Sequence, residues 1–167
     1  MVGMRPIPRR PRIAVVGAAD ATPEELAAAR AVGSALARRG AILLCGGLDG
    51  VMAAAADGAR AADGLTVGIL PTYDPDSADV SIAIPIPTGL GHARNVVVVA
   101  AADAVIAIGG GAGTLSEIAL ALKLGRPVIG LGTWRLTAPD GSPLDLVGAR
   151  SPDEAVRLAL DARSPAP

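Results

Sequence analysis

Short apolar runs and longer mixed stretches alternate along most of this chain. The apolar runs are rich in β-branched residues, and most are continuous rather than alternating with polar residues, which is typical of strands buried on both faces. The expected strands span residues 12–17, 41–46, 65–70, 80–86, 103–109, 127–131 and, more weakly, 145–149. The expected helices span residues 23–39, 48–61, 91–102, 114–124 and 152–162. We therefore predict an α/β fold, with a single doubly wound, Rossmann-like and mostly parallel sheet and helices on both faces.

One part of the chain does not fit this alternation. Residues 71–79, PTYDPDSAD, are too few and too rich in turn-forming residues to hold a crossover helix. The strand expected at 80–86 therefore has no firm place in the sheet. Residues 135–144 are expected to form a polar loop, because they contain a Pro-Asp-Gly turn signal.

A basic tail precedes the expected domain. Residues 1–11 contain Arg5, Arg9 and Arg10, which stand apart from any helical or aromatic pattern. We expect this tail to be disordered and solvated rather than a functional basic arm. The domain itself is expected to span residues 12–163 as a single Rossmann-like unit.

Composition narrows the classes of function. The chain has 167 residues and a formal net charge of −1, and it lacks Phe, so Tyr73 and Trp134 are its only large aromatic residues. We expect no nucleic-acid partner, because a base-stacking surface needs more aromatic residues. No apolar stretch is long enough to span a bilayer, so no membrane partner is expected. The single cysteine, Cys45, excludes an internal disulfide, and we expect a cytoplasmic protein.

Glycine-rich turns follow three of the expected strands. They are Gly17, the stretch CGGLDG at 45–50 and the stretch GGGAG at 109–113. In a parallel sheet these turns lie at the carboxyl edge, where helix N-termini present free N–H groups, and glycine lets those groups approach an anion. A small phosphorylated molecule is therefore the expected ligand. The loops match neither the dinucleotide fingerprint nor the P-loop, which disfavours ordinary dinucleotide or ATP binding.

Two charged residues adjoin the last glycine turn. Glu117 follows Thr114 at the spacing of a capping box, in which both residues would serve only to start a helix. Because Glu117 also follows the glycine stretch GGGAG, it is a candidate for catalysis or ligand contact as well. The same box occurs at 22–25 and 151–154 without a glycine turn. Arg94, at the start of an otherwise almost uncharged helix, is expected at the same edge, where it can pair with a phosphate or carboxylate.

The helices expected at 91–102 and 114–124 contain few charges. The first includes NVVVVAAA, which is apolar all round and predicts burial on more than the side that faces the sheet. One explanation is a loop that covers the helix. The other, which we favour, is a subunit interface that makes the protein a homodimer or homotetramer.

These motifs resemble those of the LOG-like superfamily, once described as lysine decarboxylases. That superfamily includes nucleoside 5′-monophosphate phosphoribohydrolases and molybdenum cofactor carrier proteins. Residues 109–117, GGGAGTLSE, match its enzyme signature PGGxGTxxE, and residues 91–95, GHARN, match its M-H-x-R-K element. The stretch from Cys45 to Pro71 is similar to the glycine block and following strand of the superfamily. The resemblance extends over residues 12–134.

The resemblance implies a Rossmann-like fold and a role for each matching residue. In the enzymes of the superfamily, the residues that match Arg94 and Glu117 are implicated in cleaving an N-glycosidic bond. The ligand-binding residues that the resemblance implies are Gly46, Gly47, Gly110, Gly111, Gly113 and Thr114. No required cofactor is implied, although a nucleotide or a molybdopterin-type ligand fits the pattern.

The chain departs from these two motifs at three positions. Gly109 stands for the Pro of the enzyme signature, and Gly91 and Asn95 stand for the Met and Lys of the M-H-x-R-K element. These departures favour the short branch that is similar to molybdenum cofactor carrier proteins, which hold a pterin phosphate and need no catalysis. Two functions stay open: a binding protein for a phosphorylated nucleotide-like or pterin-like ligand, and a phosphoribohydrolase. Lysine decarboxylation is not expected, because the only lysine, Lys123, lies well past the glycine turn.

A few further residues are candidates for ligand contact. The lone histidine, His92, is either an acid or base of the site or a polar residue at a helix start. Tyr73 and Trp134 each follow a strand, and either could stack on a base or pterin ring. Asp49 and Asp57 could contact ribose hydroxyls. No cluster of His, Cys and Asp has the spacing of metal ligands, so no metal site is expected.

Overall fold

The computed structural model describes residues 9–162, which form a seven-stranded sheet. Its strands are β1 (Arg12–Gly17), β2 (Ile42–Cys45), β3 (Leu65–Leu70), β4 (Ile84–Pro87), β5 (Ala104–Ile108), β6 (Val128–Leu131) and β7 (Leu146–Ala149). They lie in the order β4-β3-β2-β1-β5-β6-β7, and each neighbouring pair is parallel. The predicted α/β class is confirmed, including the weakly patterned last strand.

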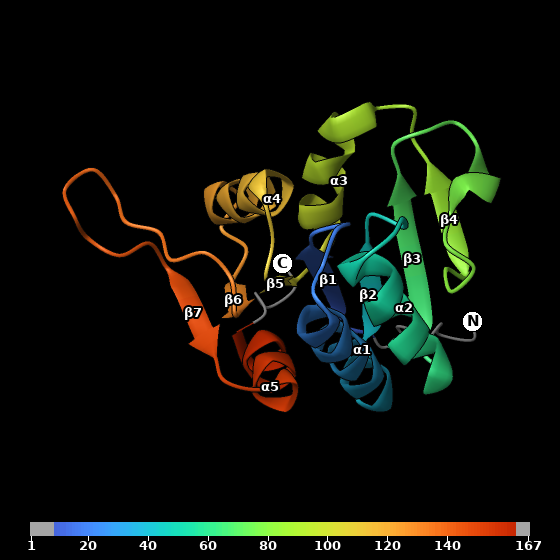
Figure 1. The fold of residues 1–167 in the computed structure, drawn as a ribbon, viewed down its shortest axis with the longest axis horizontal. Helices are drawn as coiled ribbons and strands as arrows, with labels where there is room; N and C mark the ends of the chain where they lie inside the picture. The colour runs from blue at the N-terminus through green and yellow to red at the C-terminus, as the bar shows by residue number, and fades with distance from the viewer. Residues whose placement is uncertain (1–8, 163–167) are drawn as a thin grey trace, which may run out of the picture.

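Helices cover both faces of the sheet (Figure 1). They are α1 (Pro23–Arg38), α2 (Val51–Ala61), α3 (Arg94–Ala101), α4 (Ala112–Lys123) and α5 (Pro152–Ala162). Helices α1, α2 and α5 pack on one face, and α3 and α4 on the other. Successive residues of β1 enter the two cores in turn, with Ile13 and Val15 on the first face and Ala14 and Val16 on the second. This double burial explains why the strands are apolar without alternation.

Strand β4 resolves the part of the chain that did not fit the pattern. Residues 71–83 contain only a short 3₁₀ turn, η1 (Pro75–Ser77), and β4 begins at Ile84, four residues later than expected. The hydroxyl of Thr66 on β3 donates to the carbonyl of Ser81 at 2.7 Å and accepts from the N–H of Ala83 at 2.8 Å. These two hydrogen bonds hold the segment just before β4 against β3, so the parallel crossover from β3 to β4 is made without an α-helix.

Two helices begin at residues other than those expected. Helix α2 begins at Val51 instead of 48, because Gly50 before it has a positive φ of 68° that a helix cannot contain. The segment expected as one helix over 91–102 is a 3₁₀ turn, η2 (Gly91–Ala93), followed by α3. Arg94 is consequently the first residue of α3.

The expected basic tail falls mostly outside the described residues, which begin at position 9. Arg9 and Arg12 both donate to Oδ1 of Asp103, at 2.8 Å and 2.9 Å, and Arg10 donates to the carbonyl of Gly40 at 2.8 Å. The backbone N–H of Arg12 also donates to Oδ2 of Asp103 at 2.8 Å. Residues 9–11 are therefore bonded to the amino edge of the sheet.

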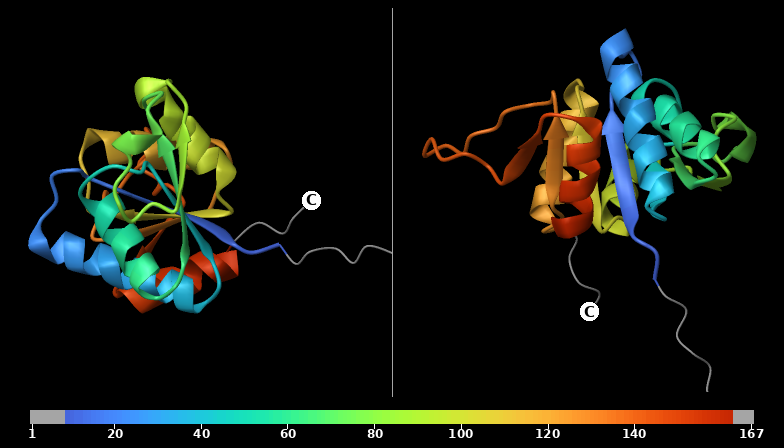
Figure 2. Two further views of the ribbon diagram at one scale, coloured as in Figure 1. Left: turned by 90° about the vertical axis from the view of Figure 1, so that its right-hand side faces the viewer. Right: turned by 90° about the horizontal axis from the view of Figure 1, so that it is seen from below.

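The strand order reverses its direction at β1, which pairs with β2 on one side and β5 on the other. At such a switch point the crossovers leave to opposite faces, and a crevice opens at the carboxyl ends of the strands. The loop between β6 and β7 projects from the far edge of the same sheet (Figure 2). Within residues 9–162, none of the helices combines the length and apolar character needed to cross a membrane.

Candidate functional site

The glycine turns after β1, β2 and β5 meet at this switch point. A Cβ on Gly17 would collide with Val51 of α2 and with the carbonyl oxygen of Ile108 at the end of β5. Gly50 is equally close to the carbonyls of Ala18 and Ala19. These contacts bring the three loops together, as predicted from their shared place at the carboxyl edge.

Arg94 extends from the start of α3 over the turn that follows β2. A side chain at Gly46 would overlap the guanidinium of Arg94, so the glycine makes the room in which this cation lies. Arg94 is only 8% exposed, and its Nε and Nη1 have no hydrogen-bond partner among the described residues. A buried guanidinium without partners carries a large desolvation cost, which a bound anion would offset.

Glu117 lies on α4 and is 7% exposed. Burial raises its pKa to about 7, and the nearby charge of Arg94 opposes this rise. Burial likewise lowers the pKa of Arg94, and Glu117 opposes that shift. The ion pairs within 4.0 Å in the described residues include neither side chain. The two groups thus affect each other without touching.

The capping box expected at Thr114 and Glu117 is wrong. Helix α4 begins at Ala112 with Gly111 as its N-cap, so Thr114 is already the third residue of the helix and Glu117 the sixth. Thr114 is buried, and its hydroxyl has no partner in the part of the chain that the structure describes. Neither side chain therefore caps the helix. Thr114 lies beside Gly110, and Glu117 is near enough to Arg94 for their charges to interact.

The other two boxes differ from each other. At residues 22–25 both reciprocal bonds are present, and the predicted box is confirmed. At residues 151–154 the N–H of Glu154 donates to Ser151 at 3.2 Å, but the carboxylate accepts from the N–H of Arg150 at 2.8 Å instead of from Ser151. Both of these boxes start helices on the opposite face from α4.

The glycines of the loop before α4 are of two kinds. Gly109 and Gly110 have positive φ angles of 53° and 109°, and a Cβ on Gly110 would overlap Thr114. The backbone therefore requires glycine at both positions. Among residues 9–162, an added Cβ on Gly111 or Gly113 meets no atom within 4 Å beyond the chain neighbours and the helix's own backbone, and neither glycine has a positive φ. The fold itself does not explain why these two positions lack side chains.

The start of the loop between β6 and β7 lies against the glycine loop. The hydroxyl of Thr133 donates to the carbonyl of Gly109, and the indole Nε1 of Trp134 donates to the carbonyl of Gly111 at 3.3 Å. A cavity of about 300 Å³ lies here, lined by Glu25, Gly109, Gly110, Gly132, Thr133 and Trp134. Trp134 was a candidate from the sequence. Thr133 and Glu25 were not, since Glu25 showed only its capping spacing and Thr133 no pattern at all.

The sequence and structure of the chain match one family along most of their length. Residues 10–156 match the model of the SLOG cluster4 family. The chain belongs to this family. An uncharacterized protein of Archaeoglobus fulgidus is 42% identical over 155 residues, which cover 89% of this chain and 94% of that protein.

Two solved structures are similar to this SLOG cluster4 chain. The molybdenum cofactor binding protein of Rippkaea orientalis is 39% identical, with a TM-score of 0.83 over 93% of this chain and 98% of the other. The molybdenum cofactor carrier protein of Chlamydomonas reinhardtii is 34% identical, with a TM-score of 0.80 over 92% and 98%. The predicted similarity to molybdenum cofactor carrier proteins is confirmed.

The remaining candidates lie at different distances from this site. Gly47 is buried after β2 with a φ of 74°, and its N–H donates to Sγ of Cys45 at 3.3 Å. Burial raises the pKa of Cys45 to about 11, which keeps the thiol protonated at neutral pH. His92 is exposed on η2, and Asp57 pairs with Arg30 between α1 and α2. Over residues 9–162, no three His, Cys, Asp or Glu side chains group as metal ligands.

Proposed function

We propose that this chain binds a phosphorylated pterin-like or nucleotide-like ligand at the glycine loop 109–114, in the manner of a molybdenum cofactor carrier. The observation that carries this proposal is Gly113. It lies in the first turn of α4, where glycine costs about 0.5–1 kcal/mol relative to alanine. Beyond its own helix backbone and chain neighbours, no atom of residues 9–162 lies within 4 Å of a Cβ added there. A ligand that contacts the backbone at this position would explain why the residue is glycine.

The comparison with the other helical glycines strengthens this argument. A Cβ on Gly33 of α1 would overlap the carbonyl of Ala55, and one on Gly58 of α2 would overlap the carbonyl of Arg30. Those two glycines let α1 and α2 pack closely. Gly113 has no packing role of this kind, so its lack of a side chain is best explained by what binds there.

The charges around the loop suit a phosphate. The free N–H groups at the start of α4 carry the positive end of the helix dipole. Arg94 and the hydroxyl of Thr114 supply buried polar groups that lack partners in residues 9–162. The similarity to two molybdenum cofactor proteins favours a molybdopterin-type ligand, and a nucleotide is the alternative. No tightly held cofactor is required for this role.

Substitution at the open glycines tests the proposal. Gly111→Leu adds a side chain that the fold can accommodate, so we expect normal thermal unfolding but an affinity for ribose 5-phosphate at least about tenfold lower. Gly113→Ala should raise stability by about 0.5 kcal/mol and weaken the same binding. Gly148→Ala is the matched control, because Gly148 of β7 also has no atom within 4 Å of an added Cβ. Normal calorimetric binding by Gly111→Leu would exclude the glycine loop as the site.

Glu117 and Arg94 favour a second candidate, a nucleoside 5′-monophosphate phosphoribohydrolase. A carboxyl group with a pKa of about 7 can take up and release a proton at neutral pH. In this reaction the bond between C1′ and the base nitrogen breaks, water adds its oxygen to C1′, and the base leaves with a proton. Glu117 would orient that water or stabilise the positive charge on the sugar, while Arg94 would hold the phosphate.

Chromatography of free base decides between the two candidates. The parent chain and Glu117→Gln are incubated with a panel of nucleoside 5′-monophosphates. Release of base by the parent chain alone would establish the hydrolase. If neither protein releases base while both bind ribose 5-phosphate, the chain is a binding protein, and the hydrolase is excluded for the compounds tested.

A further inference from the structure

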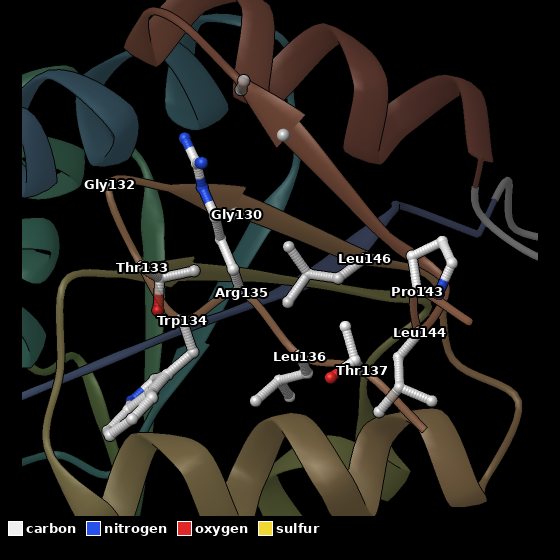
Figure 3. A pocket seen from close by; sticks show the side chains of 12 residues that line it. Gly130, Gly132, Thr133, Trp134, Arg135, Leu136, Thr137, Pro143, Leu144 and Leu146 are labelled. Carbon is white, nitrogen blue, oxygen red and sulfur yellow. The ribbon is translucent and has the colours of Figure 1, made fainter. Parts of the chain in front are cut away.

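A second cavity lies between β6, β7 and the loop that joins them. Its volume is about 470 Å³, and it is formed by the end of β6, the loop that follows and strand β7. Figure 3 shows Trp134 at one end of the open space, Pro143 and Leu144 at the other, and Leu136 and Leu146 between them. We infer that this cavity receives the ring system of the ligand, a planar fused heterobicycle such as a pterin or purine.

The cavity shares part of its lining with the smaller cavity at the proposed phosphate site, on which this inference rests. Gly132, Thr133 and Trp134 line both this cavity and the smaller one beside the glycine loop. Trp134 also donates its indole N–H to the carbonyl of Gly111, next to the first turn of α4. Trp134 therefore borders both the proposed phosphate site and the larger cavity, where a ring attached to the phosphate would contact it.

Trp134 is placed to stack on a flat ring. Its hydrogen bond to Gly111 fixes the edge of the indole, and the side chain stays 39% exposed. Stacking of a base on an aromatic side chain raises affinity by about tenfold or more and tolerates any ring with a π face. The other large aromatic residue, Tyr73, is almost fully exposed on the far side of the sheet, in the loop that leads from β3 to β4.

The walls of the cavity suit a ring with a polar rim. Leucines 136, 144 and 146 supply apolar surface, whereas Arg135 and Thr137 supply polar groups. Pockets of this size, apolar with a few polar groups, are typical of sites for drug-sized molecules. The apolar surface and the few polar groups of this lining thus suit a pterin or purine ring, whereas a sugar phosphate alone would leave the apolar surface without a contact.

The loop that closes the cavity is held in place by its own hydrogen bonds. Thr137 and Pro143 form an antiparallel bridge. The N–H of Ala138 donates to the carbonyl of Ser142 at 2.8 Å, and that of Leu144 donates to Leu136 at 3.0 Å. The cavity is therefore formed before a ligand arrives, which reduces the entropy cost of binding.

Fluorescence gives a direct test, because Trp134 is the only tryptophan in the chain. The parent protein is titrated with ribose 5-phosphate, with GMP and with a phosphate ester of a pterin. We expect the two ring compounds to quench the emission and ribose 5-phosphate to leave it almost unchanged. Tighter binding of the pterin ester or of GMP then identifies which ring the cavity prefers. Binding of both ring compounds without any change in emission would overturn the inference.

A variant that fills the cavity makes the test specific. Gly148 lines the cavity on β7, and a Cβ there meets no atom within 4 Å. Gly148→Leu should lower the affinity for the preferred ring compound about tenfold, because the added side chain takes up space that the ring needs, and leave ribose 5-phosphate binding unchanged. Val147→Leu is the control, because neighbouring residues of a strand point to opposite faces. Equal loss in both variants would exclude the cavity.

Two further readouts separate the ways in which the inference can fail. If Gly148→Leu does not fold, Trp134→Ala replaces it, with binding measured by calorimetry. The same tenfold loss, confined to the ring compounds, supports the inference, and unchanged affinity refutes it. If neither ribose 5-phosphate nor any ring compound binds the parent chain, the proposed function itself fails. If ribose 5-phosphate binds and the ring adds no affinity, only the assignment of this cavity fails.

Discussion

At the scale of single residues, Arg94 and Glu117 are both buried, and within residues 9–162 neither forms an ion pair. Each is more than nine-tenths buried, and each carries a shifted pKa caused mainly by that burial. Groups perturbed in this way concentrate at functional sites, although structural clusters also show them. Here Gly46 makes the room for Arg94, and Gly110 brings Thr114 close to the loop. The glycines and the charged pair therefore belong to one arrangement.

The raised pKa of Glu117 predicts a dependence of stability on pH. In the folded chain its pKa is about 7, against an ordinary value of 4.5, so the folded state binds more protons between these pH values. Stability must therefore fall as pH rises from about 4.5 to 7, by about 3 kcal/mol from this group alone. Denaturant unfolding of the parent chain and of Glu117→Gln, repeated from pH 4.5 to 8, measures this contribution.

The variant Glu117→Gln should lose this part of the pH dependence. The exposed residue Glu24 on α1 supplies the control, since Glu24→Gln keeps Glu117 and should therefore keep the fall in stability that Glu117 causes. Parallel curves for the parent chain and Glu117→Gln would contradict the burial of an ionisable group at this position. Bound phosphate should also shift the dependence of stability on pH to higher pH, because an anion beside Glu117 raises the pKa of its carboxyl group further.

At the scale of elements, the pattern of apolar runs predicted the strands better than the helix starts. Continuous burial on both faces leaves a clear signal in the sequence, and even the weakly patterned strand at 145–149 is present. The start of α4 was wrong by two residues, because Thr-x-x-Glu spacing is the same whether the Thr caps a helix or lies inside it. Only the backbone of Gly111 shows which residue is the cap.

The site was predictable in part for a related reason. The shared carboxyl edge brings together turns that are far apart in the sequence, so Arg94 and the glycine loop could be placed near one another before the structure was known. The contacts of Thr133 and Trp134 with the glycine loop could not be predicted in this way. They depend on how the adjoining polar segment, residues 135–144, folds back on itself. Irregular loops leave no periodic signal from which to predict such contacts.

Close packing of α1 on α2 yields a prediction at this scale. A Cβ on Gly33 would overlap the backbone of Ala55, which cannot move without shifting α2. Gly33→Ala should therefore destabilise the chain by about 1–3 kcal/mol, despite the better helix propensity of alanine. Gly113→Ala makes the same change in a helix without that contact and should be neutral or stabilising. Denaturant unfolding of both variants checks the pair, and equal effects would refute the packing role.

At the scale of the whole molecule, the two faces of the sheet are covered to different extents. Helix α1 packs against both α2 and α5 on one face, whereas α3 and α4 form a pair on the other (Figure 1). The outward side of α3 is apolar, and Ala93, Val96, Val97 and Ala100 recur there at helical spacing. Val96 and Val97 are 42% and 36% exposed, while Val98 is buried against the sheet. An apolar stripe of this kind is typical of an interaction surface.

We predict that this stripe joins two copies of the chain in a homodimer or homotetramer, because a self-complementary apolar helix face is buried most simply by its own copy. Light scattering after size-exclusion chromatography should give two or four times the mass of one chain. Val96→Lys should lower that mass, since it places a charge in the interface while keeping good helix propensity. Ala27→Lys, on the exposed side of α1, should not. A monomeric parent chain would contradict the prediction, and the stripe would then need another occupant.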